Sequence, residues 1–237
     1  MNIGVVGAGM MGCNIVKSAA KSGCVKVFDV DFTRASNAAY DFGQIACKSF
    51  DDLLDCEVIF LAVPGSAVIP LLNDYINKTE NALWINISTL LNQEHLKNSF
   101  PEARNILSIK IIGQAGSMTN GMMPVIIVDP VYGDVVTREI LDILGEVGEV
   151  VFDYEKKYLD VNMYAAEAAM VTAATLAEKL FAMNIDKKAI HAAIKGVFTG
   201  TAAQFPYGDQ DYFHKLVFVR HPDMDFSKYF LSQGNEG

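Results

Sequence analysis

The sequence has few cysteines and no run of basic residues. Its four cysteines lie between positions 13 and 56 and form no C-x-x-C motif, which favours buried thiols in a reducing cytosol over disulfides or a metal site. The net charge of −9 and the lack of a basic stripe argue against nucleic acid and anionic membranes as main partners. No apolar stretch reaches the roughly 20 residues that span a bilayer, and no secretory signal is visible. We therefore expect a cytoplasmic protein.

Several catalytic patterns are also missing. The four histidines form no H-x-x-x-H pattern and no carboxylate cluster accompanies them, so no metal site is predicted. Neither a P-loop nor a Ser-His-Asp pattern occurs. The segment from Glu155 to Met183 contains no glycine and no proline, which is typical of a long uninterrupted helix.

The first part of the chain shows a pattern of alternating strands and helices. Helical patterns lie between several short apolar runs, and this alternation predicts parallel βαβ units. The runs are Ile3–Val6, Val25–Phe28, Val58–Val63, Ala82–Ile87, Ile106–Ile112, Val125–Val128 and the segment EVVFD. Gly23 is expected to end the first helix in a left-handed conformation, Ser49 and Asp52 to cap a short helix, and Val135–Leu144 to form an amphipathic helix. The predicted fold is α/β, a Rossmann doubly wound and mainly parallel sheet.

The pattern changes after Asp153. Apolar residues recur at three- and four-residue steps from Leu159 to Leu180, which predicts one helix over Glu155–Met183. Its many alanines cover more than one face, so a close-packed homodimer through this helix is expected. Asp186 looks like the N-cap of a further helix. We place a domain boundary here, with a dinucleotide-binding domain over 1–153 and a small all-helical domain for dimerisation and substrate over 154–237.

Three glycines near the start, Gly7, Gly9 and Gly12, form a G-x-G-x-x-G motif between a predicted strand and a predicted helix. In this context the glycines permit a tight turn, close approach of a pyrophosphate, and close packing of helix and strand. Asp29 ends the second strand, where a carboxylate can accept hydrogen bonds from ribose hydroxyls and repel a 2′-phosphate, so NAD(H) is favoured over NADP(H). Arg34 lies a few residues later and can turn toward a 2′-phosphate, so NADP(H) is the alternative. A glycine turn without a ligand is the alternative.

A second turn supports a nucleotide site. The segment VIFLAVPGSAV ends a strand in small residues that can lie against a dinucleotide, although a plain strand-ending turn is the alternative. The residues assigned to the cofactor are Gly7, Ala8, Gly9, Met10, Met11, Gly12, Asp29, Arg34, Ala62, Val63 and Pro64.

Four segments together resemble the pyrroline-5-carboxylate reductase family, within the larger group of 6-phosphogluconate and β-hydroxyacid dehydrogenases. They are IGVVGAGMMG, DCEVIFLAVPGSAV, NALWINISTL and YLDVNMYAAEAAMVTAATLAEKLFAMNIDKKAI. The resemblance covers residues 1 to about 195. It implies an NAD(P)-dependent oxidoreductase that transfers a hydride between nicotinamide and a small imino, amino or hydroxy acid. A β-hydroxyacid or 6-phosphogluconate-type dehydrogenase is one alternative, and a non-catalytic dinucleotide-binding regulatory protein is another.

The sequence departs from both families at the substrate side. The resemblance implies a Ser-Gly-Ser-Gly-Pro stretch for the substrate carboxylate, but the aligned residues 166–170 read AEAAM. The lysine–asparagine pair of the β-hydroxyacid dehydrogenases is not matched either, since Lys157 and Asn162 are five residues apart and do not share a helical face.

Side chains near the expected cleft between nicotinamide and second domain are the remaining catalytic candidates. They are Ser88, Thr89, Ser117, Asn120, Tyr164 and Glu167. Ser117 and Asn120 lie in the loop Gly113–Met123, where Asn120-Gly121 also suits a plain hairpin turn. Glu167 suits a cationic substrate, an acid–base role, or a solvated helix face. We interpret Lys110 as a solvated lysine on a strand, with binding of an anionic substrate as the alternative.

Overall fold

The computed structural model describes residues 1–79, 82–207 and 212–230. The chain divides into two compact units, Met1–Tyr164 and Ala165–Gly237. The predicted boundary between residues 153 and 154 stays a prediction, and each unit is described by itself below.

Unit 1 is built on a sheet of eight strands within the described residues, in the order β3-β2-β1-β4-β5-β6-β7-β8. The strands are β1 (Asn2–Val6), β2 (Cys24–Phe28), β3 (Ile45–Cys47), β4 (Val58–Leu61), β5 (Leu83–Asn86), β6 (Ile106–Ile112), β7 (Val125–Val128) and β8 (Glu149–Phe152). Only the pair β6–β7 is antiparallel among these strands. The chain leaves β1 toward β2 and β3, and later returns to the other side of β1 as β4, so the strand order reverses between β1 and β4.

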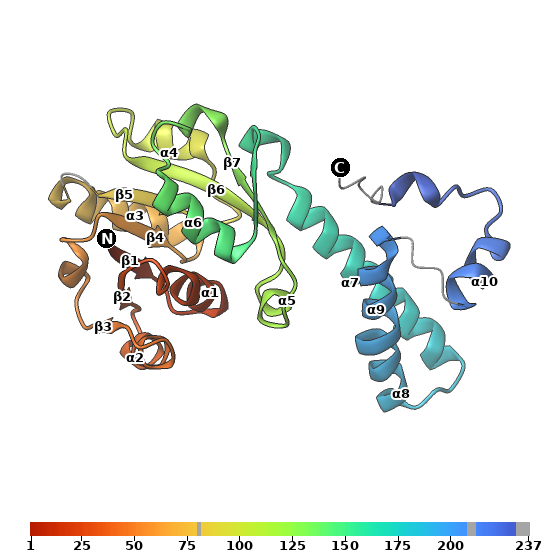
Figure 1. Cartoon of the computed structure of the whole chain (residues 1–237). Helices are drawn as coiled ribbons and strands as arrows, with labels where there is room; N and C mark the ends of the chain where they lie inside the picture. Colours follow the sequence, from red (N-terminus) through yellow and green to blue (C-terminus); the bar gives the residue numbers. More distant parts are fainter. Residues whose placement is uncertain (80–81, 208–211, 231–237) are drawn as a thin grey trace. The chain divides into compact units, whose positions relative to one another are not determined.

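Helices cover both faces of this sheet (Figure 1). They are α1 (Met10–Ala19), α2 (Phe32–Asp41), α3 (Gly65–Tyr75), α4 (Gln93–Ser99), α5 (Ala115–Thr119) and α6 (Arg138–Val147). Short turns of tighter helix lie at η1 (Phe50–Leu53), η2 (Ile76–Lys78), η3 (Pro130–Tyr132) and η4 (Glu155–Lys157). One core layer contains buried residues of α1, α2 and α6, and the other contains buried residues of η1, α3 and α4.

The strands are mainly apolar because helices cover both faces of the sheet. Neighbouring residues of one strand enter opposite layers, as Ile85 and Trp84 of β5 do. This arrangement confirms the predicted α/β class with a doubly wound, mainly parallel sheet.

Several local predictions are wrong, and each has a physical reason. Gly23 is not in a left-handed conformation; instead, a Cβ there would lie 2.3 Å from the carbonyl oxygen of Met1. A glycine with a positive φ does follow the second helix, since Gly43 after α2 has φ +65°. Strand β3 was not predicted because it is only three residues long. Helix α6 begins at Arg138, three residues later than predicted, because Tyr132 to Val136 form hydrogen-bonded turns.

The long helix begins at Val161 and not at Glu155. The Asp153 carboxylate accepts hydrogen bonds from the Tyr154 amide, the Lys157 ammonium and the Tyr158 hydroxyl. Such local side-chain bonds compete with helix formation, and they surround the short turn η4 (Glu155–Lys157). The capping pattern at Ser49 and Asp52 is present as predicted.

All the regular secondary structure in the described residues of unit 2 is helical, as the predicted class requires. Helix α7 (Val161–Ala182) crosses the boundary of the units and is followed by α8 (Lys187–Ala192), η5 (Ala193–Phe198), α9 (Thr199–Gln204), η6 (Phe205–Tyr207), α10 (Tyr212–Arg220) and η7 (Ser227–Tyr229). The Asp186 side chain accepts a hydrogen bond from the Lys188 amide, which confirms it as the N-cap of α8. Among the described residues, no helix combines the length and the apolar character that a membrane span requires.

Candidate functional site

The turn between β1 and α1 requires glycine at two of its three motif positions. Gly7 has φ +97°, and a Cβ on it would lie 2.4 Å from the carbonyl oxygen of Ala62. A Cβ on Gly12 would lie 1.8 Å from the carbonyl oxygen of Gly7, so helix α1 can lie this close to β1 only without a side chain there. Both glycines therefore shape the turn itself.

Gly9 differs from the other two glycines. A Cβ on Gly9 would meet no atom within 4 Å, and its φ of −77° and ψ of −175° are ordinary extended values. The protein's own packing therefore does not explain a glycine at this position. Gly9 directly precedes the N-terminus of α1, where free N–H groups and positive potential favour a phosphate.

Asp29 joins the end of β2 to the glycine turn. Its carboxylate accepts hydrogen bonds from the Ala8 amide at 2.7 Å and from the Asp31 amide at 2.9 Å. A carboxylate has about four lone-pair sites, so both oxygens can still accept a bond from a ligand hydroxyl. Arg34 lies in the first turn of α2, with its Nε 3.7 Å from the Asp31 carboxylate.

A cavity of about 410 Å³ lies where these elements meet. Residues from the ends of β1, β2 and β4 and from helix α3 line it. The cavity thus lies at the point where the strand order reverses, and open α/β sheets bind ligands at this point. Seven of the residues predicted for the cofactor line it, namely Gly7, Gly9, Asp29, Arg34, Ala62, Val63 and Pro64.

The other four predicted cofactor residues do not line this cavity. Ala8 is buried in the turn and Gly12 in helix α1, Met10 is 63% exposed, and Met11 packs against the core layer of α1. The cavity, the open space at Gly9 and the free end of α1 together make this place the candidate nucleotide site.

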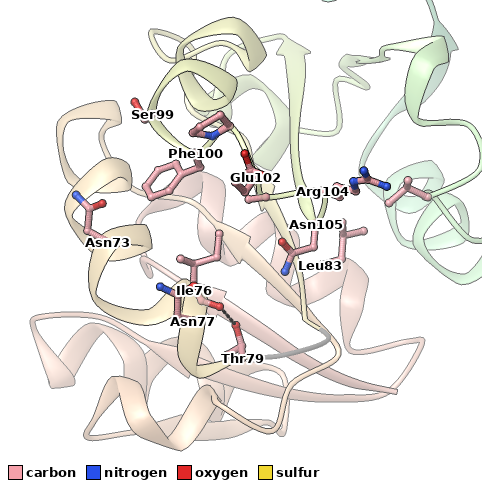
Figure 2. Close-up of a pocket in the computed structure, with 13 residues that line it drawn as sticks. Asn73, Ile76, Asn77, Thr79, Leu83, Ser99, Phe100, Glu102, Arg104 and Asn105 are labelled. Atoms are coloured by element: carbon pink, nitrogen blue, oxygen red, sulfur yellow. Dashed lines mark hydrogen bonds between the residues drawn. The ribbon is translucent and has the colours of Figure 1, made fainter.

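A larger groove, of about 1020 Å³, lies at the opposite end of the strands, near the residues where β5 and β6 begin. Figure 2 shows Asn73, Asn77, Glu102 and Asn105 along it, beside Leu83 at the start of β5. No residue predicted for the site lines this groove. The smaller cavity is the candidate functional site because ligands in such sheets bind beyond the carboxyl ends of the strands.

The catalytic candidates Ser88 and Thr89 follow β5 at the carboxyl edge of the sheet. Ser88 is buried and Thr89 is exposed. A Cβ on Gly65 would lie 2.8 Å from the Ser88 hydroxyl oxygen, so Ser88 packs against the start of α3, next to Pro64 of the cavity lining. The structure thus brings this candidate close to the predicted cofactor residues.

Ser117 and Asn120 belong to the connection between β6 and β7. This connection contains helix α5, so Asn120-Gly121 does not form the two-residue hairpin turn that was the alternative. Ser117 donates to the side chain of Gln114, and Asn120 is exposed at the end of α5. The Asn162 side chain donates to the Ile111 carbonyl at 2.7 Å and accepts from the Gly113 amide at 3.3 Å, which ties the start of α7 to the start of this connection.

Tyr164 and Glu167 lie on α7 in different units. Tyr164 is the last residue of unit 1 and is 67% exposed, and Glu167 is exposed in unit 2. Residues 166–170 are part of continuous helix. Lys157 is bound to Asp153 at 2.6 Å and Asn162 to backbone groups of unit 1, so these two residues do not act as a pair.

The interpretation of Lys110 as a solvated lysine is wrong. Its side chain is 2% exposed and lies 3.3 Å from the Glu155 carboxylate. Burial lowers the pKa of the Lys110 ammonium from its usual value, and the charge of Glu155 opposes this shift. This buried pair belongs to a polar network with Asn86, Gln93 and Ser108 that the sequence analysis missed. Within the described residues, no cluster of three potential metal ligands occurs.

Comparison with known proteins shows where this architecture recurs. Residues 2–90 match a family model described as NADP oxidoreductase, coenzyme F420-dependent. A search among curated proteins gave no match.

Several solved structures share the fold of nearly the whole chain. A pyrroline-5-carboxylate reductase from Coxiella burnetii has 16% identity and a TM-score of 0.64, with 96% of this chain and 87% of that chain covered. The Plasmodium falciparum pyrroline carboxylate reductase with NADP bound has 15% identity and a TM-score of 0.62, with 96% and 87% covered. An imine reductase variant from Myxococcus stipitatus in complex with NAD⁺ has 17% identity and a TM-score of 0.59, with 93% and 76% covered.

These matches confirm the resemblance that the sequence motifs indicated. The matched part, 93–96% of this chain in these three structures, includes residues of both units. The chain has the fold of the pyrroline-5-carboxylate reductases and the related imine reductases, and its residues 2–90 match the model of an oxidoreductase family.

Proposed function

We propose that this chain is an NAD(P)-dependent oxidoreductase that transfers a hydride between nicotinamide and a small imino, amino or hydroxy acid. The observation that carries the proposal is the cavity at the β1–β4 reversal, whose lining contains the open position at Gly9 and the Asp29 carboxylate. Dinucleotides bind at this place in doubly wound sheets.

The chain's own residues would hold the cofactor as follows. Amide groups at the start of α1, beside Gly9, would donate to the pyrophosphate. The Asp29 carboxylate would accept from the adenosine ribose hydroxyls, and Ala62, Val63 and Pro64 would present small surfaces beyond β4. The bound nicotinamide supplies the hydride, so the protein needs mainly to position donor and acceptor.

We further propose that NAD(H) is preferred over NADP(H). A 2′-phosphate on the adenosine ribose would approach the Asp29 carboxylate and be repelled by it. Arg34, the nearest cation predicted for the site, already lies 3.7 Å from the Asp31 carboxylate, which reduces the charge it offers to a phosphate.

The substrate is proposed to differ from pyrroline-5-carboxylate. The segment aligned with the Ser-Gly-Ser-Gly-Pro stretch of the reductases is continuous helix in α7, so its amides are used within the helix and none is left to bind a carboxylate. Glu167 adds a negative charge to that segment. The Gly113–Met123 connection, with Ser117 and Asn120, is the remaining candidate for a substrate carboxylate.

We propose a homodimer formed through α7. No residue of this helix is buried by its own chain within the described residues. Met163, Met170, Val171 and Phe181 are each at least half exposed, and a second copy would cover them. Light scattering at micromolar concentration should give about twice the chain mass of 25.9 kDa, and a stable monomer would contradict the proposal.

We also propose a cytoplasmic location. The four free cysteines suit such a reducing compartment.

The test of the activity combines binding with turnover. Titration calorimetry with NADH and NADPH measures the preference, and Asp29→Ala should weaken binding of NADH more than binding of NADPH. An NADH oxidation assay with pyrroline-5-carboxylate, uncharged imines, cationic imines and keto acids then identifies the substrate class. Efficient turnover of pyrroline-5-carboxylate would overturn the argument from α7.

A non-catalytic dinucleotide-binding protein is the second candidate. The continuous helix over residues 166–170 favours it, because it removes the carboxylate-binding stretch without an evident replacement. Binding of NADH with no turnover across the whole substrate panel would support this candidate. The β-hydroxyacid dehydrogenase alternative is disfavoured, since Lys157 and Asn162 are bound to other partners.

A further inference from the structure

Strand β6 contains a lysine whose charge is almost fully removed from water. The Lys110 ammonium donates to the carbonyl oxygens of Ser88 at 2.9 Å, Thr89 at 3.3 Å and Leu91 at 2.7 Å. Three of the four residues from Ser88 to Leu91 thus direct a backbone carbonyl at one side chain. We call residues 88–91 the β5 loop.

Glu155 completes the charge balance from a distant part of the chain. One of its oxygens lies 3.3 Å from the Lys110 ammonium and accepts from the Ser108 hydroxyl at 2.6 Å. The other accepts from the Gln93 amide at 2.8 Å. Each charged group therefore has the hydrogen bonds that burial requires.

Asn86 holds the β5 loop from the strand side. Its side chain accepts from the Ser88 amide at 3.1 Å and donates to the Leu91 carbonyl at 2.9 Å. Together with Lys110, it fixes both ends of a loop that has no regular secondary structure of its own.

The β5 loop packs on the turn that lines the cofactor cavity. A Cβ on Gly65 would lie 2.8 Å from the Ser88 hydroxyl oxygen and 3.4 Å from the Leu91 Cβ, and Gly65 directly follows Pro64 of the cavity lining. The loop follows β5, which pairs with β4 on the side away from β1 and β2. A dinucleotide that places its adenosine over β1 and β2 extends its second half toward this side.

Stability alone does not account for a charged pair at this place. Well-packed apolar side chains often replace buried ion pairs without loss of stability, but an apolar side chain cannot fix the direction of three carbonyl groups. Building on the proposed function, we propose that Lys110, paired with Glu155, is a positioning residue that holds the β5 loop against the nicotinamide half of a bound dinucleotide.

The experiment compares two ligands that differ only at the nicotinamide ring. ADP-ribose contains the adenosine, the pyrophosphate and the second ribose, and NADH contains these groups together with the dihydronicotinamide ring. Their dissociation constants are measured by calorimetry on the full chain for the wild type, for Lys110→Met and for the double variant Lys110→Met/Glu155→Gln, which leaves no unpaired buried charge if the single variant does not fold. Thermal melts establish that each variant is folded.

The control is Lys26→Met. Lys26 also forms an ion pair in this sheet, with Asp55, and donates to the Asp52 carbonyl, but it makes no bond to the β5 loop. The emission of bound NADH provides a second readout, because it reports the surroundings of the dihydronicotinamide ring itself.

We expect the affinity of NADH relative to ADP-ribose to fall at least fivefold in both Lys110 variants. We expect it to stay within twofold of the wild type in Lys26→Met, and the emission change of bound NADH to be lost only in the Lys110 variants. An equal loss of both ligands, or no loss, would overturn the positioning role. A wild type that binds neither ligand would instead overturn the proposed function on which this role rests.

Discussion

Replacement of Gly9 by valine should separate the fold from the cofactor site. The φ and ψ values of Gly9 are accessible to any residue, and a Cβ there meets no atom within 4 Å. The main cost to the free protein is a poorer N-cap for α1, on the order of 1 kcal/mol. In the complex, the valine methyl groups would occupy the space through which the pyrophosphate approaches the backbone.

The size of the effect follows from linkage. At a concentration one hundred times its dissociation constant, NADH stabilises the wild type by about 2.7 kcal/mol. For a chain of 237 residues, this corresponds to a rise in Tm of about 5–10 °C. If valine weakens binding a hundredfold, the same NADH concentration stabilises by only about 0.4 kcal/mol, or about 1 °C.

The assay is a thermal melt with and without NADH, followed by circular dichroism. The matched control is Gly145→Val, because Gly145 in α6 is exposed and a Cβ there also meets no atom within 4 Å. The control should keep the full rise in Tm. A Gly9→Val protein that also keeps the full rise would refute the placement of the pyrophosphate.

Three further predictions concern the fold itself. Gly12→Ala should lower the free energy of unfolding by about 3 kcal/mol or more, because its Cβ would lie 1.8 Å from a backbone oxygen; a loss below about 1 kcal/mol in urea unfolding would contradict this. Ellman's reagent should label exposed Cys24 in the native protein but not buried Cys56, since burial raises the pKa of the Cys56 thiol to about 12; labelling of Cys56 before unfolding would count against the core packing. The bonds from Lys157 and Tyr158 lower the pKa of Asp153 from 3.8 to about 2. The stability from this group is therefore present above pH 3.8 and lost toward pH 2, so Asp153→Asn should destabilise the protein at pH 7 in urea unfolding but not below pH 2, and equal stability at pH 7 would refute it.

The sequence predicted the sheet well where strands are long and buried. In a chain of alternating strands and helices, an apolar run such as Ile106–Ile112 predicts a buried strand. The glycine motif marks the first turn. The sequence did not predict β3, because three residues at the sheet edge carry too weak a pattern. It predicted the long helix too early, because the competing bonds of Asp153 are not visible in the periodicity of apolar residues.

The buried network was missed for a different reason. A lysine among apolar strand residues was interpreted by its usual preference for water. One signal was available, since Ser108 and Lys110 alternate with Ile109 and Ile111, which places both polar side chains on the same face of β6. The partner Glu155 lies 47 residues beyond Ser108, and no local pattern identifies such a distant contact.

The bond between Asp29 and the Ala8 amide restricts how cofactor preference in this protein can change. The carboxylate that would recognise a ribose also fixes the shape of the loop that would receive the phosphates. Any replacement chosen to admit a 2′-phosphate therefore also removes an anchor of that loop, unless the new side chain can still accept from Ala8. Asparagine keeps an oxygen that can accept from the Ala8 amide and removes the charge. The side chains of alanine and serine are too short to reach that amide. An evolutionary or engineered route from one dinucleotide to the other is thus expected to pass through asparagine at this position, or through Asp31 and Arg34 with Asp29 left in place.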